Sequence, residues 1–354
     1  MLRRLPLPAR RAFRLSLATG LATFAVHAAA IPLGYLGIAV TLALVSAPGP
    51  PPGLKATVAL VVIIGVTMLY GMLLGPVLIY APLAGVLLAL VGVAAGAMIS
   101  SRPGSAIIGA LVTMSSTIIA VVAAHSSAAA GSLVQAIATA FVIAILAAQV
   151  AHAVFPEDKA KPSGAPTPPA ETSWIALRSA LIMLPPLIAA LSDPGSYIML
   201  LMRGSFLAQQ AGEVSARRAG EALIGSTVLG GVVALLLWEL LKLWPGLTLL
   251  TLSLALAVLL MARPMYGIVP SRFPPGLWQY AMMTAVILLG PQLGDSGMGF
   301  EIERSMLTRL ATFVALSIYA TLAVLALDAW RRRRVGARSS SALDPRAGSR
   351  DLTT

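Results

Sequence analysis

Long apolar stretches, separated by short polar or proline- and glycine-rich segments, follow one another along almost the whole chain. A helix needs about 20 mainly apolar residues to cross the hydrocarbon core of a membrane. Stretches of about this length predict twelve membrane-spanning helices. Six are expected at 13–29, 31–47, 54–74, 77–99, 106–123 and 132–155, and six more at 174–191, 196–212, 219–241, 247–262, 277–293 and 305–330. The second, eighth and tenth are short or interrupted, and any of these three could be re-entrant.

The segment 156–173 is polar and rich in proline, and is typical of a flexible linker. It divides the chain into a first half, 1–155, and a second half, 174–334, followed by a tail at 335–354 that we expect to be disordered. The basic start and the first apolar stretch also fit a cleavable signal peptide. A matching segment at the start of the second half favours a retained helix instead.

The composition excludes a soluble globular protein. Hydrophobic residues make up 58% of the 354 residues and charged residues only 11%, whereas ordinary soluble domains are about half apolar and a quarter charged. We therefore expect an all-α, polytopic membrane protein. The absence of cysteine excludes disulfides and thiolate metal sites.

The positive charges are unevenly placed along the predicted topology. Cytoplasmic loops carry an excess of Lys and Arg. With the N-terminus inside, that side receives Arg3, Arg4, Arg10, Arg11, Lys55, Arg102, Lys159, Lys161, Arg217, Arg218, Arg263, Arg272 and Arg331 to Arg334. The opposite side receives mainly Asp193, Asp295, Glu301, Glu303, Arg304 and the pair Glu239 and Lys242. The asymmetry predicts an even number of spans, with the linker and both termini in the cytoplasm.

The two halves resemble each other in sequence. The segment 12–22 aligns with 176–186, which places Arg14 opposite Arg178, and 132–142 parallels 305–315. Tyr35 and Tyr197 each lie early in the second helix of a half. An even number of helices per half predicts two parallel six-helix repeats, related by an axis along the membrane normal. The seam between the halves is then the expected transport pathway.

Several of these segments resemble the fusaric acid resistance and aromatic acid exporter family. The start of the chain, RAFRLSLATGLA and then PLGYLGIAV, is similar to the start of that family, and RRAGEALIGSTVLGG at 217–231 is similar to its third-helix element. The similarity covers roughly 10–334. It implies a bacterial inner-membrane efflux component that works with a periplasmic adaptor protein. The soluble cytoplasmic domains of longer family members have no counterpart in this chain.

Arg203 lies near the middle of the eighth predicted span. A charge at that depth costs about 2.5–3.5 kcal/mol on insertion scales, so such residues usually line a pathway or have a buried partner. A fixed guanidinium suits a carboxylate, which it binds through two parallel hydrogen bonds. Tyr197 and Gln210, about two turns away on either side, could share its face, and Tyr35 could supply the opposing wall. The alternative is a structural arginine held by an amide or by helix carbonyls.

Other intramembrane charges are further pathway candidates. Arg14 and Arg178 could gather anions at the cytoplasmic mouth or extend to the headgroups, as long basic side chains do. Arg309 could face the outer vestibule or extend in the same way. Asp328 is expected to offset the four arginines that follow it.

These features favour an exporter of small organic anions, aromatic carboxylates above all, driven by the proton gradient. The alternatives are a passive anion channel and a non-transporting assembly subunit. No catalytic set, phosphate loop or metal-ligand spacing is visible, and His27, His125 and His152 are far apart in sequence. We expect no enzymatic activity, no cofactor and no nucleic-acid partner. The expected partners are the organic anion, membrane lipids and a periplasmic adaptor.

Overall fold

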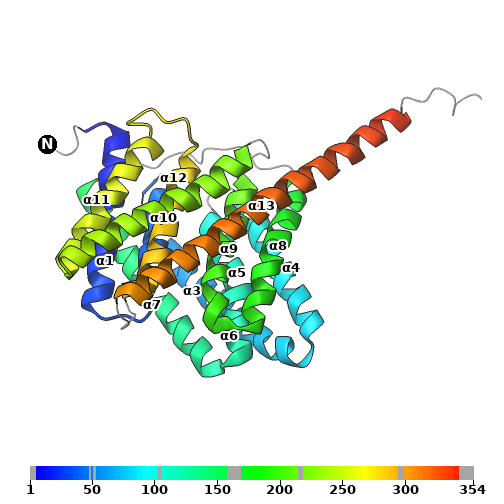
Figure 1. Ribbon diagram of the computed structural model, residues 1–354, viewed down its shortest axis with the longest axis horizontal. Coiled ribbons are helices and arrows are strands. Elements are labelled where there is room, and N and C mark those ends of the chain that lie inside the picture. Colours follow the sequence, from blue (N-terminus) through cyan, green and yellow to red (C-terminus); the bar gives the residue numbers. More distant parts are fainter. Residues whose placement is uncertain are drawn as a thin grey trace, which may run out of the picture.

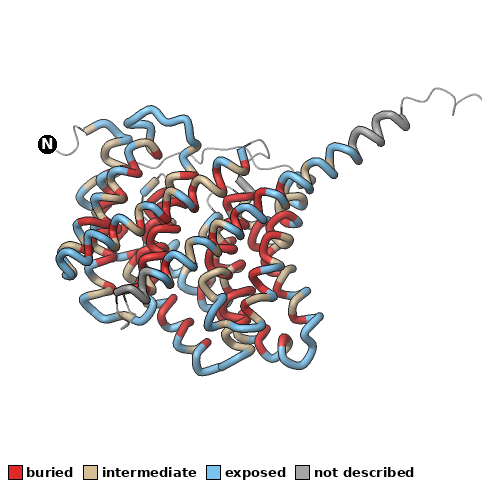
Figure 2. The backbone as a smooth tube through the Cα atoms, viewed as in Figure 1, coloured by how far each residue is buried: buried red, intermediate tan, exposed pale blue. Residues whose placement is uncertain are grey.

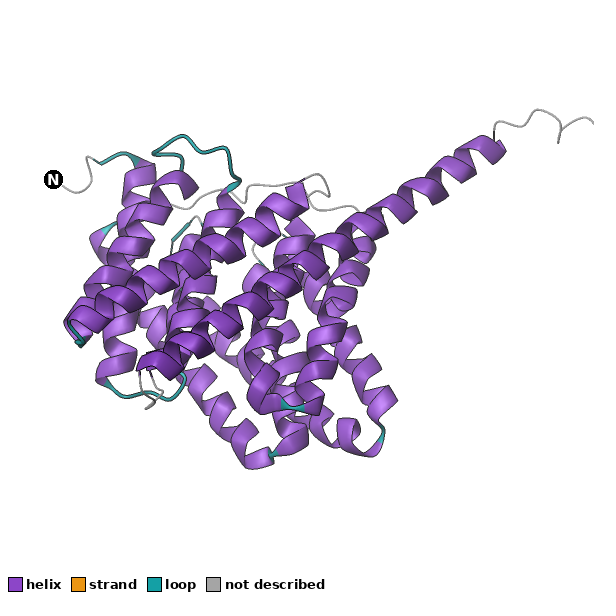
Figure 3. Cartoon of the chain, viewed as in Figure 1, coloured by secondary structure: helices purple, strands orange, loops and turns teal. Residues whose placement is uncertain are grey.

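The computed structural model describes residues 5–47, 49–50, 53–102, 105–157, 169–213, 218–293 and 299–342. Every regular element in these ranges is a helix, and the helices pack side by side into a bundle (Figures 1 and 3). The first half contains α1 (Leu7–Ala28), α2 (Tyr35–Ser46), α3 (Leu54–Tyr80), α4 (Pro82–Ser100), α5 (Ala106–Met114), the π-helical turn η2 (Ser115–Ile119), α6 (Ala120–His125) and α7 (Ser127–Val154). The second half contains α8 (Pro169–Ser192), α9 (Pro194–Glu213), α10 (Ala219–Leu243), α11 (Leu247–Met265), α12 (Pro275–Leu289), the 3₁₀ turn η4 (Gly290–Leu293) and α13 (Gly299–Ala342).

Eight helical segments in the described part of the chain are long and apolar enough to cross a membrane. They are Lys55–Tyr80, Pro82–Ser100, Ala106–His125, Ser127–Val154, Glu171–Ser192, Ala219–Leu243, Leu247–Met265 and Arg304–Arg333. The structure thus has the all-helical architecture and the long apolar helices of a polytopic membrane protein. The other four helices differ from these: α2 and α12 are short, with 12 and 15 residues. α1 carries Arg10, Arg11 and Arg14, and α9 is less apolar because it contains Arg203, Gln209 and Gln210.

The helices begin and end at positions that differ in part from those predicted. α3 continues through Gly75 and Pro76 to Tyr80, whereas a break at Pro76 was expected. A proline removes only one helical hydrogen bond, and membrane helices tolerate this loss when neighbouring helices pack against them. α4 therefore begins later than predicted, with Pro82 in its first turn, the position in which proline is favoured.

The linker and the tail are also more helical than expected. α8 already begins at Pro169, within the segment assigned to the linker, and residues 158–168 lie outside the described residues. α13 continues to Ala342, past the start of the tail at residue 335, where the sequence predicted disorder. Residues 343–354 lie outside the described residues.

The main helix pairs correspond when the two halves are exchanged. α1 packs on α2 and α8 on α9, while the third helix of each half packs on the fifth: α3 on η2 and α6, and α10 on α12. Between the halves, α1 packs on α11 and α8 packs on α4. The first helix of each half therefore lies against the fourth helix of the other.

Contacts between helix ends define the two ends of the bundle. Arg10 at the start of α1 donates a hydrogen bond to the carbonyl of Pro156 after α7, and Tyr266 after α11 donates one to the carbonyl of Ser46 at the end of α2. We call this the linker end. At the opposite end, the far end, the start of α2 packs against Gly290 of η4.

Buried residues lie mainly where helices face one another, and exposed residues cover the outside (Figure 2). The outer faces of α3 and α4 carry large apolar side chains that are more than half exposed, among them Val62, Leu73 and Leu83. Such surfaces suit lipid tails and would be unfavourable in water. The interior is therefore the place to look for a polar site.

Close packing of α4 on α5 depends on glycine. A Cβ atom at Gly96 would lie 2.7 Å from the carbonyl oxygen of Gly109, too close for any side chain. We expect Gly96→Val to lower the free energy of unfolding by about 1–3 kcal/mol or more, as overpacking does. Gly65→Val is the matched control, because nothing lies within 4 Å of its Cβ position. Thermal unfolding in detergent compares the two, and equal stabilities would contradict this account of the contact.

Candidate functional site

Arg203 of α9 is completely buried, and its side chain points toward α10. Nη2 donates hydrogen bonds to Oγ1 of Thr227 at 2.7 Å and to Oγ of Ser226 at 3.3 Å. The Thr227 hydroxyl also lies 2.6 Å from the hydroxyl of Ser317 on α13. The guanidinium therefore lies in a hydroxyl-lined site where α9, α10 and α13 meet.

Gln210 belongs to the same network. The Ser226 hydroxyl donates to Oε1 of Gln210 at 3.2 Å, and Nε2 of Gln210 donates to the carbonyl of Ala222 at 2.8 Å. Arg203 and Gln210 are seven residues apart, which is two helical turns, so they share a face of α9. The structure thus joins these two residues through Ser226, a partner that the spacing within α9 could not reveal.

The positive charge of Arg203 lacks a matching negative charge. Nε and Nη1 are buried without a hydrogen-bond partner, and no carboxylate of the described residues forms an ion pair with this side chain. A buried charge usually has an opposite charge and a full set of hydrogen bonds, because desolvation costs several kcal/mol. The described residues therefore leave two N–H-bearing nitrogens and the positive charge of Arg203 without a partner.

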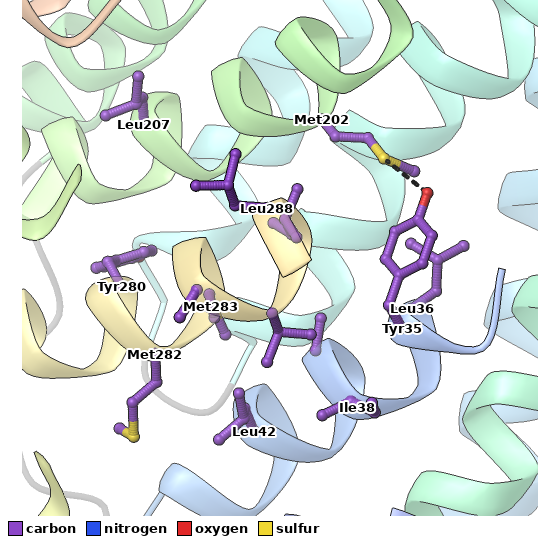
Figure 4. Close-up of a cluster of buried hydrophobic side chains, with 14 of the residues drawn as sticks. Tyr35, Leu36, Ile38, Leu42, Met202, Leu207, Tyr280, Met282, Met283 and Leu288 are labelled. Atoms are coloured by element: carbon purple, nitrogen blue, oxygen red, sulfur yellow. Dashed lines mark hydrogen bonds between the residues drawn. The ribbon is translucent and has the colours of Figure 1, made fainter. Parts of the chain in front are cut away.

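The two tyrosines lie in different surroundings. The Tyr35 ring packs against Gly290 of η4. Its hydroxyl contacts the sulfur atoms of Met199 at 3.8 Å and of Met202 at 3.9 Å on α9, and Figure 4 shows the contact with Met202. Tyr35 thus faces α9, but no hydrogen bond joins it to Arg203, Ser226 or Thr227. Tyr197, at the far end of α9, is 40% exposed and lies outside the Arg203 network.

A cavity lies at the seam, between helices of the first half and helices of the second. We call it the seam cavity. It is lined by Leu36, Ala39, Val40, Ala43, Ile107, Ala110, Leu111, Met114, Ile118, Ile137, Phe141, Met202, Ser205, Phe206, Gln209 and Ile287. Its volume is about 80 Å³, and it is partly open to the surroundings.

α9 presents different faces to the two sites. Met202, Ser205, Phe206 and Gln209 recur every three or four residues and line the seam cavity, whereas Arg203 lies on the neighbouring face. A pathway at the seam was predicted, but Gln209 and Ser205 were not among its predicted site residues. Their spacing relative to Met202 and Phe206 is the signal that could have found them.

Arg14 and Glu157 form a buried ion pair at the linker end. Nη1 of Arg14 lies 2.6 Å from Oε2 of Glu157, and the side chains are only 1% and 4% exposed. Arg11 also pairs with this carboxylate. Arg14 therefore does not extend to the headgroups as one interpretation of the sequence proposed.

The second half has a similar arrangement around Arg178. Arg178 lies 3.9 Å from the Asp328 carboxylate, which also accepts a hydrogen bond from Nε1 of Trp174. An aromatic stack accompanies each pair: Phe13 with Phe155, and Trp174 with Trp330. In both halves an arginine of the first helix thus holds a carboxylate from the last helix or just beyond it. Asp328 interacts with α8, rather than only offsetting the arginines that follow it.

The ionisation of Glu157 makes a testable contribution to stability. Burial raises the pKa of this carboxyl, but hydrogen bonds and charge from Arg11 and Arg14 outweigh burial and hold the pKa below its ordinary value of 4.5. A lowered pKa in the folded state stabilises the protein above the unfolded pKa, and this stabilisation is lost as pH falls through the folded value. We expect Glu157→Gln to lower the melting temperature near neutral pH. As the pH is lowered, the melting temperature of this variant should fall less than that of the wild type. If the melting temperatures of the variant and the wild type depend on pH in the same way, the lowered pKa of Glu157 is contradicted.

Residues 11–151 match one family model. Its description is a protein of unknown function (DUF2955), and the match runs from α1 to the last turn of α7. No curated protein and no solved structure matches the chain. The finding associates the first half with an uncharacterised family and gives no specific support to the resemblance to the aromatic acid exporters.

Proposed function

We propose that this protein is a membrane transporter that exports small organic anions, with aromatic carboxylates as the leading class. The observation that carries the proposal is Arg203, a buried guanidinium with two unpaired nitrogens and no carboxylate partner in the described part of the chain. Its geometry favours a carboxylate, which accepts two parallel hydrogen bonds from such a group. Retention of this charge inside an apolar bundle is readily explained by an anionic ligand.

We infer further that the halves are two parallel copies of one six-helix unit. The correspondence of the main helix pairs and the paired arginine–carboxylate contacts both support this. So does the likeness of IGVTMLYG at 64–71 in α3 to IGSTVLGG at 224–231 in α10. Such a repeat places the pathway at the seam, where the cavity lies. An experimental structure in which the six-helix sets fail to superpose, or superpose only when inverted, would refute the inference.

The proposed setting is the bacterial inner membrane, with twelve spans, both termini in the cytoplasm and a periplasmic adaptor as partner. The Lys and Arg excess at the linker end supports this orientation. The chain has no cysteine, so single cysteines can report sidedness directly. We expect Ser163→Cys and Ser340→Cys to react with an impermeant thiol reagent only after lysis. Labelling of either in intact cells would overturn the orientation.

Export from cells tests the proposed function. Cells with and without the protein are loaded with a labelled aromatic carboxylate, and its efflux is followed before and after a protonophore is added. We expect faster efflux with the protein, and loss of uphill export with the protonophore. Efflux that only follows the substrate gradient and the membrane potential indicates the passive channel. Equal efflux from both cell types would refute transport of that substrate.

A further inference from the structure

Four successive arginines, Arg331 to Arg334, follow directly after the apolar part of α13, which ends at Trp330. α13 continues as a helix to Ala342 and projects beyond the other helices (Figure 1). The corresponding helix of the first half, α7, ends at Val154, and the chain then continues with Phe, Pro, Glu and Asp. The basic extension of α13 therefore has no counterpart at the end of α7.

The surrounding residues do not neutralise the charge of this extension. Arg332 and Arg333 are exposed and form no ion pair with any residue that the structure describes. The nearest acid in the sequence is Asp328, but it pairs with Arg178 of α8 and accepts a hydrogen bond from Trp174. A patch of positive charge therefore remains at the surface, where α13 leaves the bundle.

Two stacked indole rings lie beside these arginines. The ring centroids of Trp174 and Trp330 are 5.9 Å apart, and the Arg331 guanidinium lies 5.5 Å from the centroid of the Trp174 ring. Tryptophan is enriched at the headgroup level of membranes, where its ring meets both apolar chains and polar groups. Successive residues of a helix are turned by about 100°, so Arg332 and Arg333 are turned away from the α8 side that Arg331 faces. These two arginines therefore face outward at the expected depth of the lipid headgroups.

We propose that Arg332 and Arg333, together with the neighbouring indole pair, bind the phosphate group of an anionic membrane lipid. A guanidinium binds phosphate oxygens through two parallel hydrogen bonds, and basic clusters next to a membrane helix attract anionic lipids. The acyl chains of the lipid lie along the outer face of α13, where Leu322 and Leu325 are exposed. An acidic protein segment would match the charge but not this adjoining apolar face. The proposal needs only a membrane location of the bundle, and it does not rest on export or on Arg203.

Tryptophan quenching tests this proposal, because Trp174 and Trp330 lie at the site itself. Trp238, Trp244 and Trp278 are replaced by phenylalanine, so that only this pair reports. The protein is placed in nanodiscs of phosphatidylcholine in which a fixed fraction of the lipid carries dibrominated acyl chains. The brominated lipid is either phosphatidylglycerol, which is anionic, or phosphatidylcholine, which has no net charge. The extent of quenching by each gives the relative binding constant of the two lipids at this site.

Variants of single arginines locate the preference. We expect the protein to prefer phosphatidylglycerol by about tenfold or more at low ionic strength. Arg332→Gln and Arg333→Gln should each lower the preference about fivefold, which corresponds to about 1 kcal/mol for one charge near the membrane surface, and both together should bring it close to one. Replacement of both arginines by lysine keeps the charge and should retain most of the preference. Arg304→Gln, at an exposed arginine near the other end of α13, is the matched control and should leave it unchanged.

Three results would overturn the proposal. Equal quenching by the two lipids in the protein with both arginines would show that the indole pair does not lie beside an anionic lipid. A preference that survives Arg332→Gln combined with Arg333→Gln would place the binding elsewhere. An equal loss of preference in Arg304→Gln would show a general effect of positive charge rather than a site at the end of α13.

Discussion

Replacing Arg203 with glutamine is expected to remove most organic-anion export while the protein still inserts and folds. Glutamine keeps the ability to hydrogen bond to Thr227 but supplies no positive charge. Hydrogen bonds to charged groups contribute about 1.5–3 kcal/mol each, so loss of one predicts a roughly 10- to 150-fold lower export rate at low substrate concentration. Initial export rates, normalised to the amount of protein in the membrane, measure the effect.

Two further variants separate binding by Arg203 from a structural role. Arg203→Lys keeps the charge but loses the paired hydrogen bonds of a guanidinium, and should retain partial export of a carboxylate. Arg304→Gln, at an exposed arginine of α13, is the control and should leave export unchanged. A structural arginine would instead give low membrane levels for both Arg203 variants. Wild-type export by well-expressed Arg203→Gln would show that the site lies elsewhere, with Arg309 the next candidate.

The second large effect is expected at the ion pair between Arg14 and Glu157. Glu157→Ala leaves Arg14 buried without its carboxylate, and removal of one member of a buried pair typically costs about 3–5 kcal/mol. Glu239→Ala is the matched control. Glu239 pairs with Lys242, but these side chains are 55% and 36% exposed, and exposed pairs contribute less than about 1 kcal/mol. Thermal or denaturant unfolding in detergent should show a larger loss of unfolding free energy for Glu157→Ala than for Glu239→Ala.

A double-mutant cycle completes this test. Arg14→Met combined with Glu157→Met removes both charges and leaves neither group unpaired, so the double variant should be more stable than the sum of the single effects predicts. Additive effects would show that the two groups do not stabilise each other. A loss of less than about 1 kcal/mol in Glu157→Ala would contradict the assignment of a buried pair.

The helices could be predicted from the sequence because each apolar run is long and bounded by polar or proline-rich residues. Their ends were harder to predict. Pro76 marked a break, yet α3 continues through it, because Gly75 lets α6 pack closely enough to support the helix there: a Cβ at Gly75 would lie 2.8 Å from the backbone of Ala123. This contact joins helices far apart in sequence, so a local pattern does not contain it.

The candidate site could likewise be predicted from the sequence only in part. The spacing of Arg203 and Gln210 on one helix correctly predicted that they lie on one face. Their partner Ser226, on α10, depends on how α9 and α10 pack. Tyr197 was predicted to share this face, but it lies six residues before Arg203, a spacing that turns it to another side of α9, and it is exposed. The seam cavity exists only because side chains from both halves leave space between them, which periodicity along one chain cannot reveal.

Anion flux in a purified system tests the central claim most directly. Wild-type protein and Arg203→Gln are reconstituted into liposomes, and uptake of a labelled aromatic carboxylate is followed with and without an imposed proton gradient, together with the current. We predict carboxylate flux with the wild type that the proton gradient drives uphill, and little flux with Arg203→Gln at equal protein content. Wild-type flux no greater than that of protein-free liposomes, for every carboxylate tried and with every gradient, would contradict the account.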